Sequence, residues 1–397
     1  MKDVSQAIKA DLSAARRIVL GMDCWSKKGL SDSFLGVSAS FFNPVTNQPQ
    51  HVLLNLHLIP HPHTSLMLAD KITSSLTQWE IHESKLLMAV TDNGSNMIKA
   101  INSIQFSRQV NPSVGANSEN ADEAELTDEG TGNVDDTDDS EVSEGYDDIC
   151  DDDGCSDQAQ AETDDGDLSM DAVMEEVVSL HRLPCVAHTL QLVLKEIDKN
   201  AAYCNLITKT RKLVQQMRKS SVATTSLIQK CGKTVVVDCS TRWNSVYIML
   251  ARLLEIKPAL LEVMEQMKLD GLLSSEWARL AELCKLLEPF REQTDIMQTD
   301  TLSLSSLIPS LLELTLHLQD ASFTKALSLP LLNALRRRFA AFLDPIDVQF
   351  DPIPAAATFL DPTVSTTTLQ RDDMMNLLQA AKTYIRKEAC TVMVYSG

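Results

Sequence analysis

Apolar runs of strand length recur through the first hundred residues and are separated by polar turn residues. Four such runs have the apolar and β-branched content that favours strands, namely residues 18–25 (IVLGMDCW), 34–42 (FLGVSASFF), 51–59 (HVLLNLHLI) and 86–90 (LLMAV). Between the third and fourth runs, residues 64–79 place apolar side chains at helical spacing, with Thr64 as the expected N-cap. The predicted order is therefore three strands, a helix and a strand, which indicates an α/β domain.

Two of these strands end in an aspartate, Asp23 and Asp92. After Asp92, Asn93-Gly94 indicates a turn and Ser95 is placed to cap a helix that begins at Asn96. Asp92 by itself is explained as a turn or capping residue. Together the two aspartates occupy the position at which α/β sheets carry ligand sites, and two such carboxylates can bind Mg²⁺ or Mn²⁺ for phosphoryl transfer.

From residue 181 onward the pattern is helical. Residues 181–197 predict a helix with Pro184 in its first turn. Further helices are expected after residues 241–244 until Pro258 stops the chain, and over 277–290, 303–318 and 328–343. Near the end, residues 372–387 predict one more helix and TVMVY (391–395) a terminal strand.

Several polar residues of this half are candidate site residues. Cys185 and His188 share a helix face, but a zinc site needs two more ligands, so a structural role is the simpler interpretation. Five cations lie on one predicted helix and form either a solvated face or a phosphate-contacting face: Lys209, Arg211, Lys212, Arg218 and Lys219.

One segment carries the whole acidic excess of the chain. Of the 55 Asp and Glu residues, 25 lie between Gln109 and Leu180, and this segment contains no Lys or Arg. The rest of the chain therefore has 30 acidic and 35 basic residues. With few large apolar residues, range 106–177 is expected to be a disordered insert, either a solvated spacer or a surface for basic partners such as histones. Cys150 and Cys155 within it lack matching zinc ligands.

Composition excludes several classes of protein. There is no run of 18 apolar residues and no signal-peptide pattern, so we expect no membrane partner. Nine scattered cysteines favour reduced thiols over a disulfide framework. Nothing in the sequence indicates a small-molecule substrate.

Ordered motifs over residues 18–362 resemble the hAT superfamily of DNA transposases, and most closely its domesticated relatives, the zinc finger BED domain-containing proteins. The matching motifs include MDCWSKKGLSDSFLGVSASFF, AVTDNGSNMIKA, LPCVAHTLQLV, STRWNSVYIMLARLLEIKPAL and ATFLDP. The resemblance implies a ribonuclease-H-like domain interrupted by a large α-helical insertion.

The resemblance also assigns roles to individual residues. Asp23 and Asp92 match the first two catalytic acids of the family, and Cys185 and His188 match its CxxH signature. Arg242 and Trp243 fall in the insertion, where the tryptophan of the family handles hairpin or flipped-base DNA. A nuclear location and dimerisation with related hAT chains are implied as well.

Two motifs of the family have no match in these 397 residues: the Ser-Glu-Arg motif that carries the third acid, and the BED zinc finger. We therefore expect an incomplete ribonuclease-H-like domain in a catalytically inactive, transposase-derived nuclear protein that binds nucleic acid or chromatin proteins. The alternatives are a two-metal transposase or nuclease with an acid from elsewhere, for which Glu196 is one candidate, and an acidic histone-binding module.

The expected domain organisation follows from these patterns. Residues 1–105 form the first part of the ribonuclease-H-like domain, and 106–177 the acidic insert. Residues 178–350 form the helical insertion, and 351–397 begin a C-terminal region with few closing elements, so we expect marginal stability or dependence on a partner.

Overall fold

The computed structural model describes residues 2–26, 33–60, 63–110, 174–239, 243–297, 304–321, 324–364 and 371–395. Contacts divide the chain into two units, one comprising Met1–Phe106 with Ser179–Gly397 and the other Ser107–Val178. Most of the acidic insert, Arg242, Cys150 and Cys155 lie outside the described residues.

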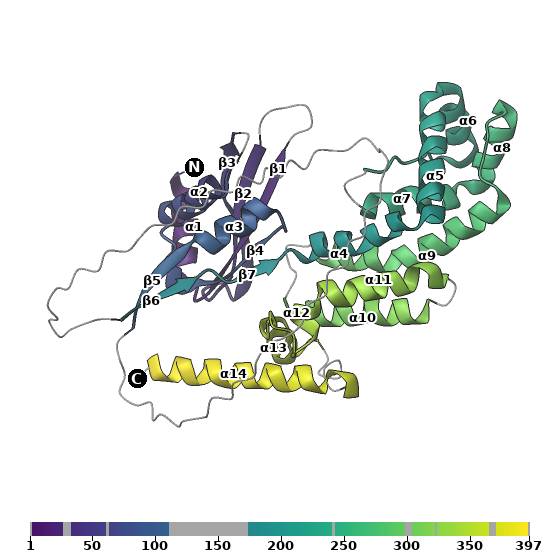
Figure 1. Cartoon of the computed structure of the whole chain (residues 1–397). Helices are drawn as coiled ribbons and strands as arrows, with labels where there is room; N and C mark the ends of the chain where they lie inside the picture. Colours follow the sequence, from purple (N-terminus) through teal and green to yellow (C-terminus); the bar gives the residue numbers. More distant parts are fainter. Residues whose placement is uncertain are drawn as a thin grey trace, which may run out of the picture. The chain divides into compact units, whose positions relative to one another are not determined.

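A five-stranded mixed sheet forms the first part of the larger unit (Figure 1). The strand order is β3-β2-β1-β4-β7, with bounds β1 Ile18–Ser26, β2 Ser33–Asn43, β3 Gln48–Ile59, β4 Leu86–Thr91 and β7 Arg182–Pro184. β1–β2 and β2–β3 are antiparallel, whereas β1–β4 and β4–β7 are parallel. All four strands predicted in the first hundred residues are confirmed.

Three helices cover one face of this sheet, and their bounds are α1 Lys2–Ala14, α2 Ser65–Gln78 and α3 Ser95–Ser103. Their apolar residues, such as Leu12, Ile72 and Ile101, form one buried cluster with Leu20 and Val37 of the sheet. The predicted cap of α2 is confirmed, because the Thr64 hydroxyl accepts a hydrogen bond from the Met67 amide at 3.3 Å.

The expected start of α3 is wrong by one residue. The N-cap is Gly94 rather than Ser95, and no side chain caps the helix. Instead the Asp92 carboxylate accepts the Gly94 amide at 3.1 Å, so the acid itself organises this turn.

Pro184 does not begin a helix, as the sequence predicted, but ends strand β7. It pairs with Thr91 of β4, and α4 (Val186–Leu194) begins after Cys185, its N-cap. Proline has no amide hydrogen, so it suits the last position of a short edge strand as well as the first turn of a helix.

The remaining elements are helical, apart from one pair of strands. They are η2 (Lys195–Lys199), α5 (Ala201–Lys219), α6 (Ser221–Cys231), α7 (Trp243–Glu255), α8 (Lys257–Met267), α9 (Ser274–Met297), η3 (Leu304–Ser306), α10 (Leu307–Asp320), α11 (Lys325–Arg338), α12 (Ala340–Leu343), α13 (Ile353–Leu360), η5 (Asp372–Met374) and α14 (Met375–Tyr395). Residues 181–343 were expected to be all-α, and this is confirmed for the described residues that follow β7.

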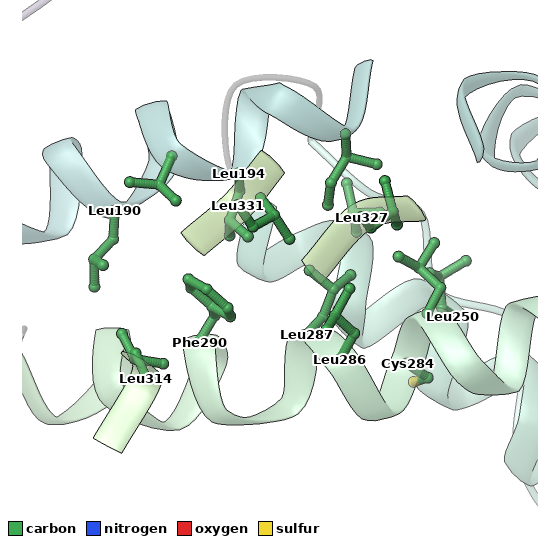
Figure 2. Close-up of a cluster of buried hydrophobic side chains, with 14 of the residues drawn as sticks. Leu190, Leu194, Leu250, Cys284, Leu286, Leu287, Phe290, Leu314, Leu327 and Leu331 are labelled. Carbon is green, nitrogen blue, oxygen red and sulfur yellow. The ribbon is translucent and has the colours of Figure 1, made fainter. Parts of the chain in front are cut away.

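A second apolar core joins these helices. Figure 2 shows side chains from α4, α7, α9, α10 and α11 in one buried cluster, in which Phe290 is fully buried. The cluster also takes in Met88 of β4 and Leu183 of β7, so the helical part packs against the face of the sheet opposite α1–α3.

Three local expectations differ from the structure. TVMVY continues helix α14 and is not a terminal strand. The ends of the predicted disordered insert pair as two strands, β5 (Gln105–Val110) and β6 (Met174–Ser179). Helices α1 and α13 were not expected. Among the described residues, no helix has the length and apolar character needed to cross a membrane.

Candidate metal site at the carboxyl edge of the sheet

The strand register brings three predicted site residues into one row. Met22 of β1 pairs with Thr91 of β4, and Thr91 pairs with Pro184 of β7. The next residues along the chain after Met22, Thr91 and Pro184 are Asp23, Asp92 and Cys185, respectively. The Cys185 amide donates to the Thr91 carbonyl at 2.6 Å, which extends the ladder by one step. The three residues therefore lie in one row across neighbouring strands: Asp23 inside β1, one step beyond its pairing with β4, and Asp92 and Cys185 directly after β4 and β7.

Both carboxylates belong to the same face of the sheet. Side chains two residues apart on a strand share a face, so Asp23 lies on the face of Val19 and Asp92 on that of Val90. Val19 and Val90 both pack against the helical core. Asp23 is exposed and Asp92 is half-buried, so the pair lies at a solvent-accessible border of the sheet beside α4.

Arg182 of β7 holds the turn that carries Asp92. Its Nε donates to Thr91 Oγ1 at 2.8 Å, and its Nη2 donates to the Asp92 carbonyl at 2.5 Å and to Asn93 Oδ1 at 2.8 Å. Burial lowers the pKa of Arg182, while the charge of Asp92 opposes that shift. The guanidinium thus fixes the backbone of the turn that carries Asp92.

Two thiols lie near both carboxylates. Burial raises the pKa of Cys24 to about 12, and the charges of Asp92 and Asp23 add to this effect. Burial also raises the pKa of Cys185, and the charges of Asp23 and Asp92 raise it slightly further. Hydrogen bonds from the backbone amides of His188 and Ala187 lower this pKa and so oppose the shift. Both thiols are therefore protonated near neutral pH, and His188 lies half-exposed in the first turn of α4.

The donor set suits a hard divalent cation. Two carboxylates fit Mg²⁺ or Mn²⁺, which prefer oxygen and are commonly bound by one or two carboxylates together with water or substrate phosphate. The neutral thiol of Cys185, directly after β7, is a poor ligand for Mg²⁺ or Mn²⁺. Within the part of the chain that the structure describes, no group of three or more His, Cys, Asp or Glu side chains is arranged to bind a metal.

Glu196, the expected alternative for a third acid, is held elsewhere. It lies in η2 and forms ion pairs with Lys199 at 3.0 Å and with Arg337 of α11 at 3.5 Å. Its charge is thus compensated within the helical part.

The cations of α5 divide into two groups. Lys209 forms an ion pair with Glu276 at 2.7 Å, and Arg211 forms one with Asp238 at 2.7 Å. Lys212, Arg218 and Lys219 are exposed and form no ion pair with the described residues. These three make up the basic face of α5.

Trp243 begins α7 and is half-buried against the helical core. α7 packs on α9 and α8, and α5 packs on α6 and η2, so both lie among the helices. The structure therefore gathers Asp23, Asp92 and Cys185, while Trp243 and the basic face of α5 belong to the helical part.

Sequence reasoning missed Arg182 and Cys24. Arg182 stands between a histidine and a leucine with no pattern to mark it, and only the β4–β7 pairing shows its role. Cys24 follows Asp23 directly, but its burial depends on packing against α1–α3, which the strand pattern does not reveal.

Comparison with known proteins finds related domains in both parts of the chain. The ZBED1 RNase-like domain matches residues 21–117, and the ZBED1 RNase-like helical domain matches residues 183–286. The first match contains Asp23 and Asp92, and the second contains Cys185 and Trp243. The chain belongs to the hAT-derived family of zinc finger BED-type proteins.

Two curated relatives support this membership. Zinc finger BED domain-containing protein 4 of Homo sapiens is 25% identical over 187 residues, which is 45% of this chain and 16% of that protein. The putative AC transposase of Zea mays is 31% identical over 135 residues, which is 31% of this chain and 16% of that protein. The matched segment thus spans about a sixth of either relative, and this hAT-derived chain shares an RNase-like sheet and a helical part with the family.

Proposed function

We propose that this hAT-derived chain is a nuclear, chromatin-associated factor that binds nucleic acid without cleaving it. The sheet order β3-β2-β1-β4-β7 supports a ribonuclease-H-like origin of the RNase-like part, with the helical part as its insertion. The nuclear location and the association with related hAT chains are extensions from the family.

One observation carries the proposal: among the described residues no third carboxylate is grouped with Asp23 and Asp92, whose remaining neighbour is the protonated thiol of Cys185. Asp23 and Asp92 can bind a single divalent cation, but Cys185 adds no charge to hold a second. Two-metal displacement needs both cations to stabilise the attacking and the leaving oxygen. The site therefore favours weak, single-ion binding over strand cleavage.

Binding is proposed to occur through the basic face of α5. Lys212 and Lys219 are seven residues apart on one helix, so they lie on the same side, and Arg218 is adjacent. Outside the acidic segment the chain has a small basic excess, which allows phosphate contact despite the overall charge of −20.

The binding test is fluorescence anisotropy with labelled duplex DNA at several salt concentrations. A Lys212→Ala/Arg218→Ala/Lys219→Ala variant should bind roughly tenfold or more weakly, and its salt slope should fall by up to about 3. The matched control replaces three exposed lysines of other helices, Lys99, Lys285 and Lys325, and should leave the slope nearly unchanged. Equal loss in both variants would contradict a role for α5.

The catalytic question has a separate test. Calorimetric titration with Mn²⁺ should show binding that the Asp23→Asn/Asp92→Asn variant loses, while a nicking assay on supercoiled DNA should show no product. The proximity of the two carboxylates favours one alternative, a DNA nuclease whose third catalytic carboxylate is supplied from elsewhere. Nicking that Asp92→Asn abolishes would establish that alternative and overturn the proposal.

A further inference from the structure

The junction between α5 and α6 presents a short exposed segment, residues 218–222 (RKSSV) (Figure 1). One helix ends and the next begins within it, so that a single residue, Ser220, separates the two. Four of its five side chains are exposed, with Val222 at 68%, and only that of Ser220 is half-buried. The flanking residues, Met217 and Ala223, are fully buried in the helical core.

The two serines of this segment have different roles. Ser220 is the N-cap of α6, and its hydroxyl accepts a hydrogen bond from the Ala223 amide at 3.2 Å. Ser221 is exposed, and its hydroxyl forms no hydrogen bond with the described residues. The Ser221 hydroxyl is therefore the one that this segment presents for modification.

Two cations precede this hydroxyl along the chain. Arg218 and Lys219 stand three and two residues before Ser221, and the apolar Val222 follows it. Ser221 is the only serine or threonine of the sequence with Lys or Arg at both of these positions. Basophilic protein kinases recognise this arrangement, because carboxylates beside their active site bind the two cations and an apolar pocket accepts the residue after the serine.

The segment can open without disturbing the core. A kinase binds its substrate as an extended strand, and Ser220 already has extended dihedral angles, φ −98° and ψ 108°. The Thr224 hydroxyl donates to the Met217 carbonyl at 3.1 Å, and this bond lies outside the segment, so α5 and α6 stay joined while it opens. Because the five side chains bury little apolar surface, fraying of these two helix ends costs far less than global unfolding.

We propose that Ser221 is the acceptor of a basophilic serine kinase and that its phosphorylation weakens the basic face of α5; the second part rests on the proposed DNA binding. The Ser221 Oγ attacks the γ-phosphorus of ATP, so an Oγ–P bond forms and the bond from that phosphorus to the bridging oxygen breaks. ADP leaves, and the hydroxyl proton passes to a carboxylate of the kinase and then to water.

The product places an anion beside two of the three cations of the basic face. A phosphoserine carries a charge of about −1.5 to −2 at neutral pH and pairs well with arginine. Phosphoserine at position 221 should therefore occupy Arg218 and Lys219, which then no longer contact the phosphates of DNA. A phosphate in the first turn of α6 is compatible with the helix dipole, so the fold should be retained.

The first test treats the full chain with ATP, Mg²⁺ and the catalytic subunit of cAMP-dependent protein kinase, and locates the phosphate by tandem mass spectrometry. Ser221 should be modified, Ser221→Ala should not, and Ser220→Ala should still accept phosphate. Arg218→Ala should slow the transfer roughly tenfold or more, whereas Arg338→Ala, at an exposed arginine of α11, should match the wild type. No transfer, transfer mainly to another residue, or an unchanged rate in Arg218→Ala would overturn the assignment.

The second test compares the affinity of the phosphorylated and unmodified chains for duplex DNA by anisotropy at several salt concentrations. Phosphorylation should weaken binding roughly tenfold and lower the salt slope by up to about 2, with unchanged circular dichroism. Kinase treatment of Ser221→Ala should leave its binding unaltered. Equal affinity of both forms would overturn the effect on the basic face. An unmodified chain that binds no DNA would contradict the proposed function and this effect with it, whereas the acceptor role of Ser221 is decided by the first test alone.

Discussion

The guanidinium of Arg182 lies 2.5 Å from the backbone carbonyl of Asp92, with further bonds to Thr91 and Asn93 on either side. One arginine on the edge strand β7 thus fixes the turn from which the Asp92 carboxylate projects. Because β7 leads directly into α4, this contact links the position of the carboxylate to the start of the helical part.

Replacing Arg182 should loosen this turn. Arg182→Gln loses the fork of donors and leaves partly buried acceptors unpaired, so the free energy of unfolding should fall by about 1–3 kcal/mol. Arg182→Lys should recover only part of this, since an ammonium cannot make the bidentate contact. Urea unfolding measures the change, and exposed Arg338→Gln is the control. An Arg182→Gln variant as stable as the control would contradict the bracing role.

Supplying a third carboxylate should strengthen cation binding. Cys185→Asp places an acid on the strand end beside Asp92, where burial now keeps a thiol neutral. The additional charge should raise Mn²⁺ affinity at least tenfold, and Mn²⁺ should then stabilise the variant more than the wild type. Calorimetry and thermal shift measure both effects, with exposed Cys390→Asp as the control. Unchanged affinity would mean that the position of Cys185 does not reach the cation.

The site illustrates what strand patterns predict and what they omit. Apolar runs leading to Asp23 and Asp92 were enough to expect two neighbouring carboxylates, because β1 and β4 are parallel and Met22 pairs with Thr91, although β1 continues past Asp23 to Ser26. The role of Arg182 could not be predicted, since β7 is three residues long and its pairing depends on a contact across 90 sequence positions.

The ends of the chain show the same limit. TVMVY has the β-branched residues of a strand, but it follows a helix without a break and continues α14. Local propensity is overridden where a preceding helix already supplies hydrogen-bond partners.

The two site thiols should resist alkylation. The raised pKa values of Cys24 and Cys185 leave little thiolate at about pH 8, whereas Cys239 and Cys390 are exposed. Iodoacetamide labelling followed by mass spectrometry should modify the exposed pair first. Asp92→Asn removes a charge that raises both pKa values, so it should speed labelling of Cys24 and Cys185 without affecting Cys390. An unchanged rate would contradict their proximity to Asp92.

Stability should depend on the ionisation of His181. Its Nε2 lies 3.0 Å from the buried Asp351 carboxylate, and that hydrogen bond raises the pKa of His181 above its ordinary value of 6.5. A histidine with a raised folded pKa adds stability that is fully present below pH 6.5 and is lost as the pH rises through the folded pKa. The free energy of unfolding should therefore include a component that falls as the pH rises above 6.5 and passes through the raised pKa of His181.

His181→Gln keeps a hydrogen-bond donor but cannot be protonated, so it should remove this component while leaving the fold intact. Denaturant unfolding at several pH values in that window measures the effect. His82→Gln is the matched control, because His82 bonds to Ser84 beside it and faces no carboxylate in those contacts. If the His181→Gln variant kept the pH dependence of the wild type, the pair with Asp351 would not be its source.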